Sequence, residues 1–468
     1  MFSARVFWHD IPFHCPTLEG SCSRALIRLA PPQQYIGFRM FKHLKIAALG
    51  LATIAAPAIA QPVVVSDSGD TAWILTASAL VLLMTIPGLA LFYGGLVRAR
   101  NVLSVIMHCF VITCVVSLFW AVIGYSLTFG AGTPLLGGVG NVMLAGLADL
   151  RADTTIPESA FALFQMTFAI ITPALVIGAF VERIRFGWVV AFSLLWSLFV
   201  YVPVAHWVWG DGWLANGGTL DFAGGIVVHT TAGIAALVLA KMLGPRRGFN
   251  KSLLPPHSPA LTMAGAGLLW VGWYGFNGGS ALAAGDDAAT AIINTHLAAC
   301  SAALVWILIE KVKIGKPTSI GIVTGAVAGL ATVTPAAGLV GPFGGIALGL
   351  IGGTACFYMV QWVKQTLKID DSLDVFAVHG VGGILGSLLF PLFILPVLGG
   401  PGFEDGVTLA HQLGAQGVGV VVTAIWTLVM TIMIALGISY VIPMRVDEEA
   451  EHDGLDLSAH GERGWELD

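Results

Sequence analysis

The sequence predicts an all-α polytopic membrane protein with eleven transmembrane helices. Of its 468 residues, 56% are hydrophobic and only 10% are charged, whereas a soluble domain carries about 25% charged residues. A chain of this composition cannot present enough polar surface to water, so we expect it to lie in a lipid bilayer. Its 58 glycines and 14 tryptophans agree with this, because glycine lets membrane helices pack closely and tryptophan prefers their interfacial ends.

Residues 40–60 have the features of a secretory signal peptide. Lys42, His43 and Lys45 precede an apolar run that ends at 58–60, Ala-Ile-Ala, a typical cleavage site. A signal peptide does not normally start so far into a protein. We therefore interpret residues 1–39 as an extension from an upstream start codon, and we expect the mature chain to begin near residue 61.

Apolar stretches of helical length then follow one another to residue 441, each long enough for an α-helix to cross a bilayer. We assign residues 61–441 to one membrane domain and residues 442–468 to a C-terminal tail. The eleven stretches cover, in order, residues 72–95, 103–127, 159–181, 187–208, 222–243, 261–281, 290–310, 319–335, 342–364, 374–397 and 410–441.

The charges of the loops predict the orientation, because Lys and Arg accumulate in cytoplasmic loops. Cleavage after residue 60 leaves the mature N-terminus outside, and the first inner loop then holds Arg98 and Arg100. Each later inner loop also holds Lys or Arg, whereas the outer loops hold Asp and Glu, with Arg151 as the exception. We therefore expect a multi-pass protein of the cell inner membrane with its tail in the cytoplasm.

The two halves of the membrane domain resemble each other. Spans one and six share an aromatic and glycine pattern at 91–95 and 274–279, and spans five and ten each run from an aspartate to a histidine at 221–229 and 374–379. Five spans reverse the direction of the next five, so we predict an inverted five-helix repeat plus one additional helix. In inverted-repeat transporters the substrate path lies between the halves near the membrane midplane.

Two histidines fall inside the predicted spans at equivalent positions. His229 follows Asp221 by about 12 Å of helix and enters from outside, whereas His379 follows Asp374 by about 7.5 Å and enters from the cytoplasm. A polar side chain at this depth faces the interior and needs a partner, and the nearest candidate for each histidine is the other. A single buried histidine is more often a structural contact, but a symmetric pair favours a path lined by two imidazoles, which can each donate and accept a hydrogen bond.

The two aspartates before these spans are predicted to be helix caps, because a carboxylate accepts the free N–H groups of a helix start. Asp221 would in addition attract a cation to the outer mouth, and Asp374 would cap span ten on the inner side.

Tryptophan at a span end is usually an interfacial anchor. Aromatic faces beside a carboxylate also hold small cations, at about 0.5–2 kcal/mol per contact, and aromatic residues gather at this mouth on spans three, four and six.

A mechanism follows from the absence of carboxylates and lysines deep in the predicted spans. A bare cation would face a penalty of several kcal/mol there, so neutralisation is the easier route. The cation would lose its proton at the mouth and pass as a small neutral amine beside the histidines, which are suited to carrying a proton. Sodium or potassium would instead need a cage of carbonyl or carboxylate oxygens.

The motifs of the chain resemble those of the ammonium transporter, methylammonium permease and Rhesus family, and within it the bacterial ammonium transporters, from about residue 70 to 464. The resemblance implies a homotrimer with one pore per subunit that takes ammonium or methylammonium. The motifs are Thr85-Ile86-Pro87-Gly88, Phe92-Tyr93-Gly94-Gly95, Gly178-Ala179-Phe180-Val181-Glu182-Arg183, Asp221-Phe222-Ala223-Gly224-Gly225, Gly272-Trp273-Tyr274-Gly275-Phe276-Asn277 and Val378-His379-Gly380-Val381.

The resemblance also implies roles for individual residues. The family's outer recruitment site matches Trp209, Phe164 and Ser280, and its phenylalanine gate matches Phe168 and Phe276. Its pore-lining tryptophan matches Trp273, its twin histidines match His229 and His379, and its structural aspartate matches Asp221.

The charged tail has a composition typical of disorder. The resemblance implies instead that the tail packs under the trimer, couples the subunits and helps to bind a PII-type signal protein.

Two other classes of function compete with transport. An ammonium sensor with little flux would use the same fold, although residues 442–468 are too few for a kinase or cyclase domain. A membrane enzyme with the histidines as metal ligands would need a third ligand, which the sequence does not offer nearby. We expect no enzymatic activity, no cofactor or metal, and no nucleic-acid partner.

Overall fold

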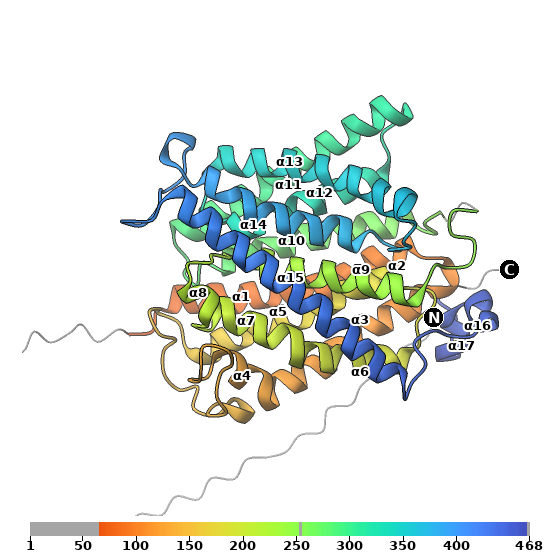
Figure 1. The fold of residues 1–468 in the computed structure, drawn as a ribbon, viewed down its shortest axis with the longest axis horizontal. Coiled ribbons are helices and arrows are strands. Elements are labelled where there is room, and N and C mark those ends of the chain that lie inside the picture. Colours follow the sequence, from red (N-terminus) through yellow and green to blue (C-terminus); the bar gives the residue numbers. More distant parts are fainter. Residues whose placement is uncertain (1–64, 252–254, 466–468) are drawn as a thin grey trace, which may run out of the picture. The chain divides into compact units, whose positions relative to one another are not determined.

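The computed structural model describes residues 65–251 and 255–465, and in these residues the chain is built of helices (Figure 1). Extended pairing in the same residues is limited to isolated β-bridges, such as the one between Ile184 and Arg445. The all-α prediction is therefore confirmed. The predicted extension at 1–39 and signal peptide at 40–60 lie outside the described residues.

Ten helical segments of the described chain are long and apolar enough to cross a membrane, which makes this a multi-pass membrane protein. The sixth predicted span, α10 (Pro259–Gly279), is not among them. It has 21 residues, about 31 Å of helix, which matches the ~30 Å apolar core of a bilayer. Its glycines, aromatic residues and Asn277 make it too polar to count as apolar by composition. The exact number of eleven spans therefore stays a prediction.

Most of the ten segments consist of successive helices, and π-helical or 3₁₀ turns divide them. The first five segments comprise α1 (Ser68–Leu83), η1 (Met84–Leu89) and α2 (Ala90–Leu96); η2 (Ala99–Asn101), α3 (Val102–Phe119), η3 (Trp120–Gly124) and α4 (Tyr125–Phe129); α5 (Glu158–Val176) and η5 (Ile177–Ala179); α6 (Phe186–Trp196), η6 (Ser197–Tyr201), α7 (Val202–Trp209) and α8 (Trp213–Asn216); and η7 (Gly225–Thr230) and α9 (Thr231–Leu243).

The other five segments follow α10. They comprise α11 (Asp286–Ile314); α12 (Ser319–Val333) and η8 (Thr334–Ala336); α13 (Pro342–Gln361) and η9 (Trp362–Thr366); η10 (Phe376–Gly380) and α14 (Val381–Phe393); and α15 (Leu409–Ser439). Two 3₁₀ turns in loops, η4 (Val142–Leu144) and η11 (Pro396–Leu398), and two short helices near the C-terminus, α16 (Glu448–Asp453) and α17 (Leu455–His460), complete the described elements.

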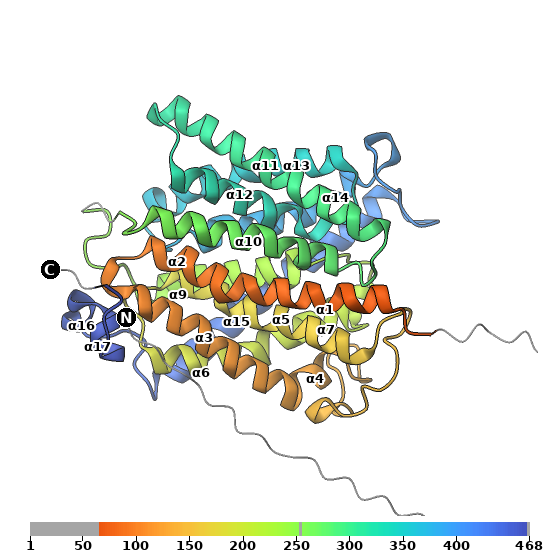
Figure 2. The ribbon, with the colours of Figure 1, turned by 180° about the vertical axis from the view of Figure 1, so that it is seen from behind.

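The helices pack in a way that brings the two halves of the repeat together. Helix α1 lies against α10 and α5, and α11 lies against α12 and α13 (Figure 2). Helix α15 crosses the bundle diagonally and contacts α6, α9 and α14 (Figure 1). The half-helix η7 packs on α14 of the other half, and η10 packs on α9 in return. This reciprocal contact is what an inverted repeat predicts.

The two short C-terminal helices dock at the end of the bundle where α2 meets α3, which we call the inner end after the predicted orientation. The carboxylate of Asp456 accepts the backbone N–H of Ser104 at 2.8 Å, and Leu455 donates its N–H to the Asn101 side chain at 2.8 Å. The described part of the tail is thus a folded element that is fixed to η2 and α3.

A buried ion network joins the loops at the same inner end. Glu182 is 3% exposed, and its carboxylate accepts hydrogen bonds from Arg98 at 2.8 and 3.0 Å, from Asn101 at 3.0 Å and from Arg246 at 3.1 Å. Arg246 also pairs with Asp370 at 2.9 Å. Burial alone would raise the pKa of Glu182, but Arg246 and Arg98 outweigh it, so the pKa is lowered and the carboxylate stays ionised.

We expect Glu182→Gln to destabilise the protein by about 3–5 kcal/mol, because it removes the buried negative charge that pairs with Arg98 and Arg246. Thermal unfolding in detergent at neutral pH measures this, with the exposed Glu404→Gln as the matched control. Because the folded-state pKa of Glu182 is lowered, the network stabilises the protein above the ordinary glutamate range. The difference between wild type and variant should therefore shrink as the pH falls below that range. Equal unfolding temperatures at neutral pH would contradict the assignment.

Candidate functional site

The two predicted histidines meet in the interior of the bundle. Their Nδ1 atoms are 3.3 Å apart, the ring centroids are 5.2 Å apart and the rings are inclined by 24°. His229 is 1% exposed and His379 is 4% exposed. At this distance one Nδ1 carries a hydrogen and the other accepts it, so the pair needs two complementary tautomers. The Nε2 atom of His229 is buried and has no hydrogen-bond partner in the described chain.

Glycines four residues after each histidine allow this meeting. A Cβ atom on Gly383 would lie 2.5 Å from the carbonyl oxygen of Gly225 and 2.7 Å from the Cβ atom of His229. A Cβ atom on Gly233 would lie 2.2 Å from the Cα atom of Gly380. These neighbours are backbone atoms or the Cβ atom of a side chain, which cannot turn away, so the two half-helices cross at a distance that only glycine permits.

Each histidine also sits in a π-helical turn, His229 in η7 and His379 in η10. Such turns recur at functional sites in helices because they redirect a side chain. The symmetry predicted for the histidines thus extends to the local backbone.

The aspartate that caps span ten is Asp371, and the expectation for Asp374 is wrong. The Asp221 carboxylate accepts four backbone N–H bonds, from Gly224 through Val227, at 2.7–2.9 Å. Asp371 is the equivalent residue, since it accepts the N–H groups of Val375 and Phe376 at 3.1 and 2.8 Å. Both capping aspartates precede their histidine by eight residues. That equal spacing was the signal in the sequence that could have identified Asp371.

An outer cavity of about 420 Å³ opens beside the end of α7. Trp209, Ser280 and Phe168 line it together with Gln165 and other residues. The indole N–H of Trp209 donates to the carbonyl oxygen of Asp221 at 2.8 Å, which fixes the ring beside the capped start of η7. The Ser280 hydroxyl donates to the carbonyl of Phe276 at 2.8 Å, and its oxygen keeps lone pairs that can accept from a ligand.

Two phenylalanine rings stand between the outer cavity and the interior, since Phe168 lines the outer cavity and Phe276 lines the void beyond it. The rings of Phe168 and Phe276 lie with centroids 4.3 Å apart, and Phe168 also contacts Trp209 at 5.8 Å. Phe164 is fully buried behind them, 4.9 Å from the ring of Phe168. It supports the Phe168 ring and is not among the residues that line the cavity.

A narrow void follows on the other side of Phe276. His229, His379, Trp273 and Phe276 line it among apolar side chains, and its volume is about 10 Å³, roughly the space for one water-sized molecule. The indole N–H of Trp273 donates to the Thr334 hydroxyl at 2.9 Å, so it is not free to bond a molecule in the void. The imidazoles are therefore the polar groups that the void presents.

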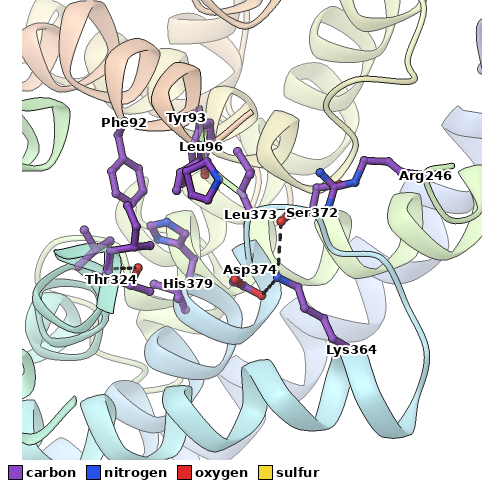
Figure 3. Close-up of a pocket in the computed structure, with 14 residues that line it drawn as sticks. Phe92, Tyr93, Leu96, Arg246, Thr324, Lys364, Ser372, Leu373, Asp374 and His379 are labelled. Atoms are coloured by element: carbon purple, nitrogen blue, oxygen red, sulfur yellow. Dashed lines mark hydrogen bonds and ion pairs between the residues drawn. The ribbon is translucent and has the colours of Figure 1, made fainter. Parts of the chain in front are cut away.

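An inner cavity of about 210 Å³ begins where the void ends, and His379 lines both (Figure 3). Its wall holds three charged side chains, those of Asp374, Lys364 and Arg246, among apolar residues. Lys364 forms an ion pair with Asp374 at 2.6 Å. In the sequence, Lys364 is one of the basic residues of the predicted inner loops, and no spacing in the sequence brings it next to span ten.

The metal-enzyme hypothesis needs a third ligand beside the histidines. Within residues 65–251 and 255–465, no group of three or more His, Cys, Asp or Glu side chains is arranged to hold a metal ion.

Comparisons with known proteins agree with this architecture. A sequence model of the Ammonium Transporter Family matches residues 72–465. A putative ammonium transporter of Methanothermobacter thermautotrophicus is 48% identical over 86% of this chain and 99% of its own length. An ammonium transporter of Aquifex aeolicus is 47% identical over 86% of this chain and 94% of its own length. Among solved structures, one titled Sensor Amt Protein superposes with a TM-score of 0.78 at 30% identity, over 84% of this chain and 98% of that chain.

The helix crossing gives a direct test. We expect Gly383→Ala to lower the stability by about 1–3 kcal/mol, because the added methyl group overlaps backbone atoms that cannot move independently. Gly267→Ala in α10 is the matched control, since a Cβ atom there meets nothing within 4 Å. Thermal unfolding in detergent compares the two variants. If both unfold at the wild-type temperature, the crossing is not as tight as described.

Proposed function

This chain belongs to the ammonium transporter family and transports ammonium, and we propose that it does so by deprotonating the ion and conducting ammonia past the two histidines. In this mechanism NH4+ is recruited in the outer cavity beside Trp209 and Ser280. It gives up its proton near Phe168 and Phe276, and NH3 moves through the narrow void to the inner cavity. The proton either follows by way of the histidines or stays outside.

The observation that carries this proposal is the contact of 3.3 Å between the histidine Nδ1 atoms in a void of about 10 Å³, with wider cavities on both sides. A void of this size admits one small molecule and none of its hydration shell. A cation there would lose its water without gaining a carboxylate, which is unfavourable by several kcal/mol. A neutral amine loses far less, and it can hydrogen-bond to an imidazole nitrogen.

The recruitment step has support from the aromatic surroundings. Trp209 presents a ring to the outer cavity, and the ring face attracts cations by about 0.5–2 kcal/mol. Asp221 uses its carboxylate to cap η7 through four N–H bonds, so we propose that it acts through its long-range charge and not as a ligand. Ser280 adds a hydroxyl acceptor for an N–H group of the ion.

We also propose a homotrimer, with α10 and α11 in the subunit interface. His296 lies in α11, exposed in the single chain, and its Nδ1 pairs with the Tyr274 hydroxyl of α10 at 2.8 Å. Polar side chains in a membrane span face protein and not lipid, so a neighbouring subunit is the natural cover for this pair.

The membrane and partner assignments complete the proposal. Each subunit would span the cell inner membrane with the end that carries α16 and α17 in the cytoplasm. The docked helices and the basic loops around them offer a folded surface for a PII-type signal protein.

A second candidate function is ammonium sensing with little flux. One observation favours it, the structural likeness to a protein titled Sensor Amt Protein, with a TM-score of 0.78. Growth of a transporter-deficient strain on low ammonium separates the two functions, because a sensor without flux does not rescue growth.

For transport, we expect His229→Ala and His379→Ala each to reduce methylammonium uptake into proteoliposomes by at least about tenfold. The loss of one buried hydrogen bond costs about 1.4 kcal/mol, and this energy corresponds to a factor of ten. A change of ion selectivity is the other acceptable result, since removing an imidazole widens the void. The exposed His411→Ala is the matched control and should transport like the wild type.

The same proteoliposomes decide whether the proton crosses. Electrical recording during an ammonium pulse gives a current if the proton follows and no current if it stays outside. Unchanged uptake and unchanged ion selectivity in both histidine variants, with the oligomer intact, would exclude the proposed pore.

A further inference from the structure

The inner cavity contains a built-in ammonium group. The Nζ atom of Lys364 lies 2.6 Å from Oδ1 of Asp374 and 3.5 Å from the carbonyl oxygen of Ser372, and Figure 3 shows the side chain reaching between these two acceptors. All three residues line the same cavity as His379. The lysine head therefore stands at the exit that a molecule reaches after it has passed the histidines.

The lysine head and the ammonium ion have closely similar chemistry. A lysine presents three N–H donors on a compact, strongly hydrated positive nitrogen, and NH4+ presents four on the same kind of nitrogen. A carboxylate oxygen with a carbonyl oxygen beside it accepts from either. The cradle that holds Lys364 is therefore also a cradle for NH4+, the form that ammonia takes when it meets water near neutral pH.

The other carboxylates near this cavity are already committed. Asp370 pairs with Arg246 at 2.9 Å, Glu182 pairs with Arg98 and Arg246 at 3.0 and 3.1 Å, and Asp371 caps η10. Asp374 is different, since in the described chain its ion-pair partner is Lys364 alone. Arg246 also lines the cavity, but its guanidinium is held by Asp370 and Glu182.

The backbone at both partners departs from regular geometry. Asp374 has a φ of 63°, a left-handed conformation that is strained for a non-glycine residue and that clusters at active sites and ligand clamps. Lys364 lies in the π-helical turn η9, a second feature of such positions. A surface ion pair needs neither distortion, because two exposed side chains can find each other from regular helices.

We propose that Asp374 and the Ser372 carbonyl form an inner binding site for ammonium ions, and that Lys364 occupies this site as a tethered competitor. The tether gives the lysine a high effective concentration at the site, so an ion formed at the exit is not retained there. The side chains of Asp374 and Lys364 are 22% and 26% exposed, respectively, so an ion displaced from the cradle reaches solvent directly. This inference rests on the proposed function, because it takes the inner cavity to be the exit of the pathway.

The test removes the competitor and leaves the cradle. We expect Lys364→Met to be inhibited by ammonium inside proteoliposomes at about tenfold lower concentration than the wild type, since an ion pair in a partly exposed site is worth about one power of ten in binding. Lys364→Arg keeps a cation on the carboxylate and is the matched control, expected to behave like the wild type. The double variant Lys364→Met with Asp374→Asn should lose the added inhibition.

A binding measurement keeps this inference separate from transport. Ammonium chloride should raise the unfolding temperature of detergent-solubilised Lys364→Met more than that of the wild type or the double variant, with choline chloride as the ionic-strength control because choline has no N–H donor. If Lys364→Met shows neither the added inhibition nor the added stabilisation, the inner site does not exist, although uptake by the wild type still supports the proposed function. If the wild type shows no uptake, the proposed function fails, and the unfolding measurement still decides whether the site binds ammonium.

Discussion

The close crossing of two half-helices is the constraint on which the pathway depends. Backbone atoms of η7 and α14, and of α9 and η10, approach within distances that exclude a Cβ atom at Gly383 and Gly233. Each glycine lies four residues after a histidine, on the same face of its helix, so the contact that joins the halves also sets the separation of His229 and His379. A larger residue at either glycine would separate the imidazoles and open the void, and in the proposed mechanism it would end the conduction of one small molecule at a time.

The placement of charge follows from the same crossing. Two half-helices that start inside the protein leave free N–H groups there, and a buried start without acceptors is costly. The carboxylates of Asp221 and Asp371 accept these N–H groups, Asp221 at the start of η7 and Asp371 at the start of η10. Both carboxylates are held at the helix starts, and neither of them lines the void. The aspartates thus stabilise the half-helices and leave a centre that favours a neutral molecule.

Much of this arrangement could be predicted from the sequence, because it depends on periodicity and spacing. Apolar length gave the positions of the helices, and the matching positions of His229 and His379 in inverted halves predicted that they meet. The prediction of Asp374 as the cap was wrong because three aspartates stand within five positions before span ten. Asp374 is the one nearest to the span, but proximity in the sequence does not decide which carboxylate reaches the free N–H groups. The buried place of Phe164 and the partnership of Lys364 with Asp374 depend on which way side chains turn after packing, and no spacing in the chain encodes that.

The two mouths of the proposed pathway differ in the contacts that they offer to a cation. The outer cavity offers aromatic faces and a hydroxyl, contacts that hold an ion weakly and let it exchange. The inner cavity offers a carboxylate, a stronger acceptor, but a lysine already holds it. A passive path cannot set the direction of net flux, which follows the gradient alone. It can set how long an ion stays at each end, and a weak site outside with an occupied site inside keeps the exit clear whenever the gradient drives ammonium inward.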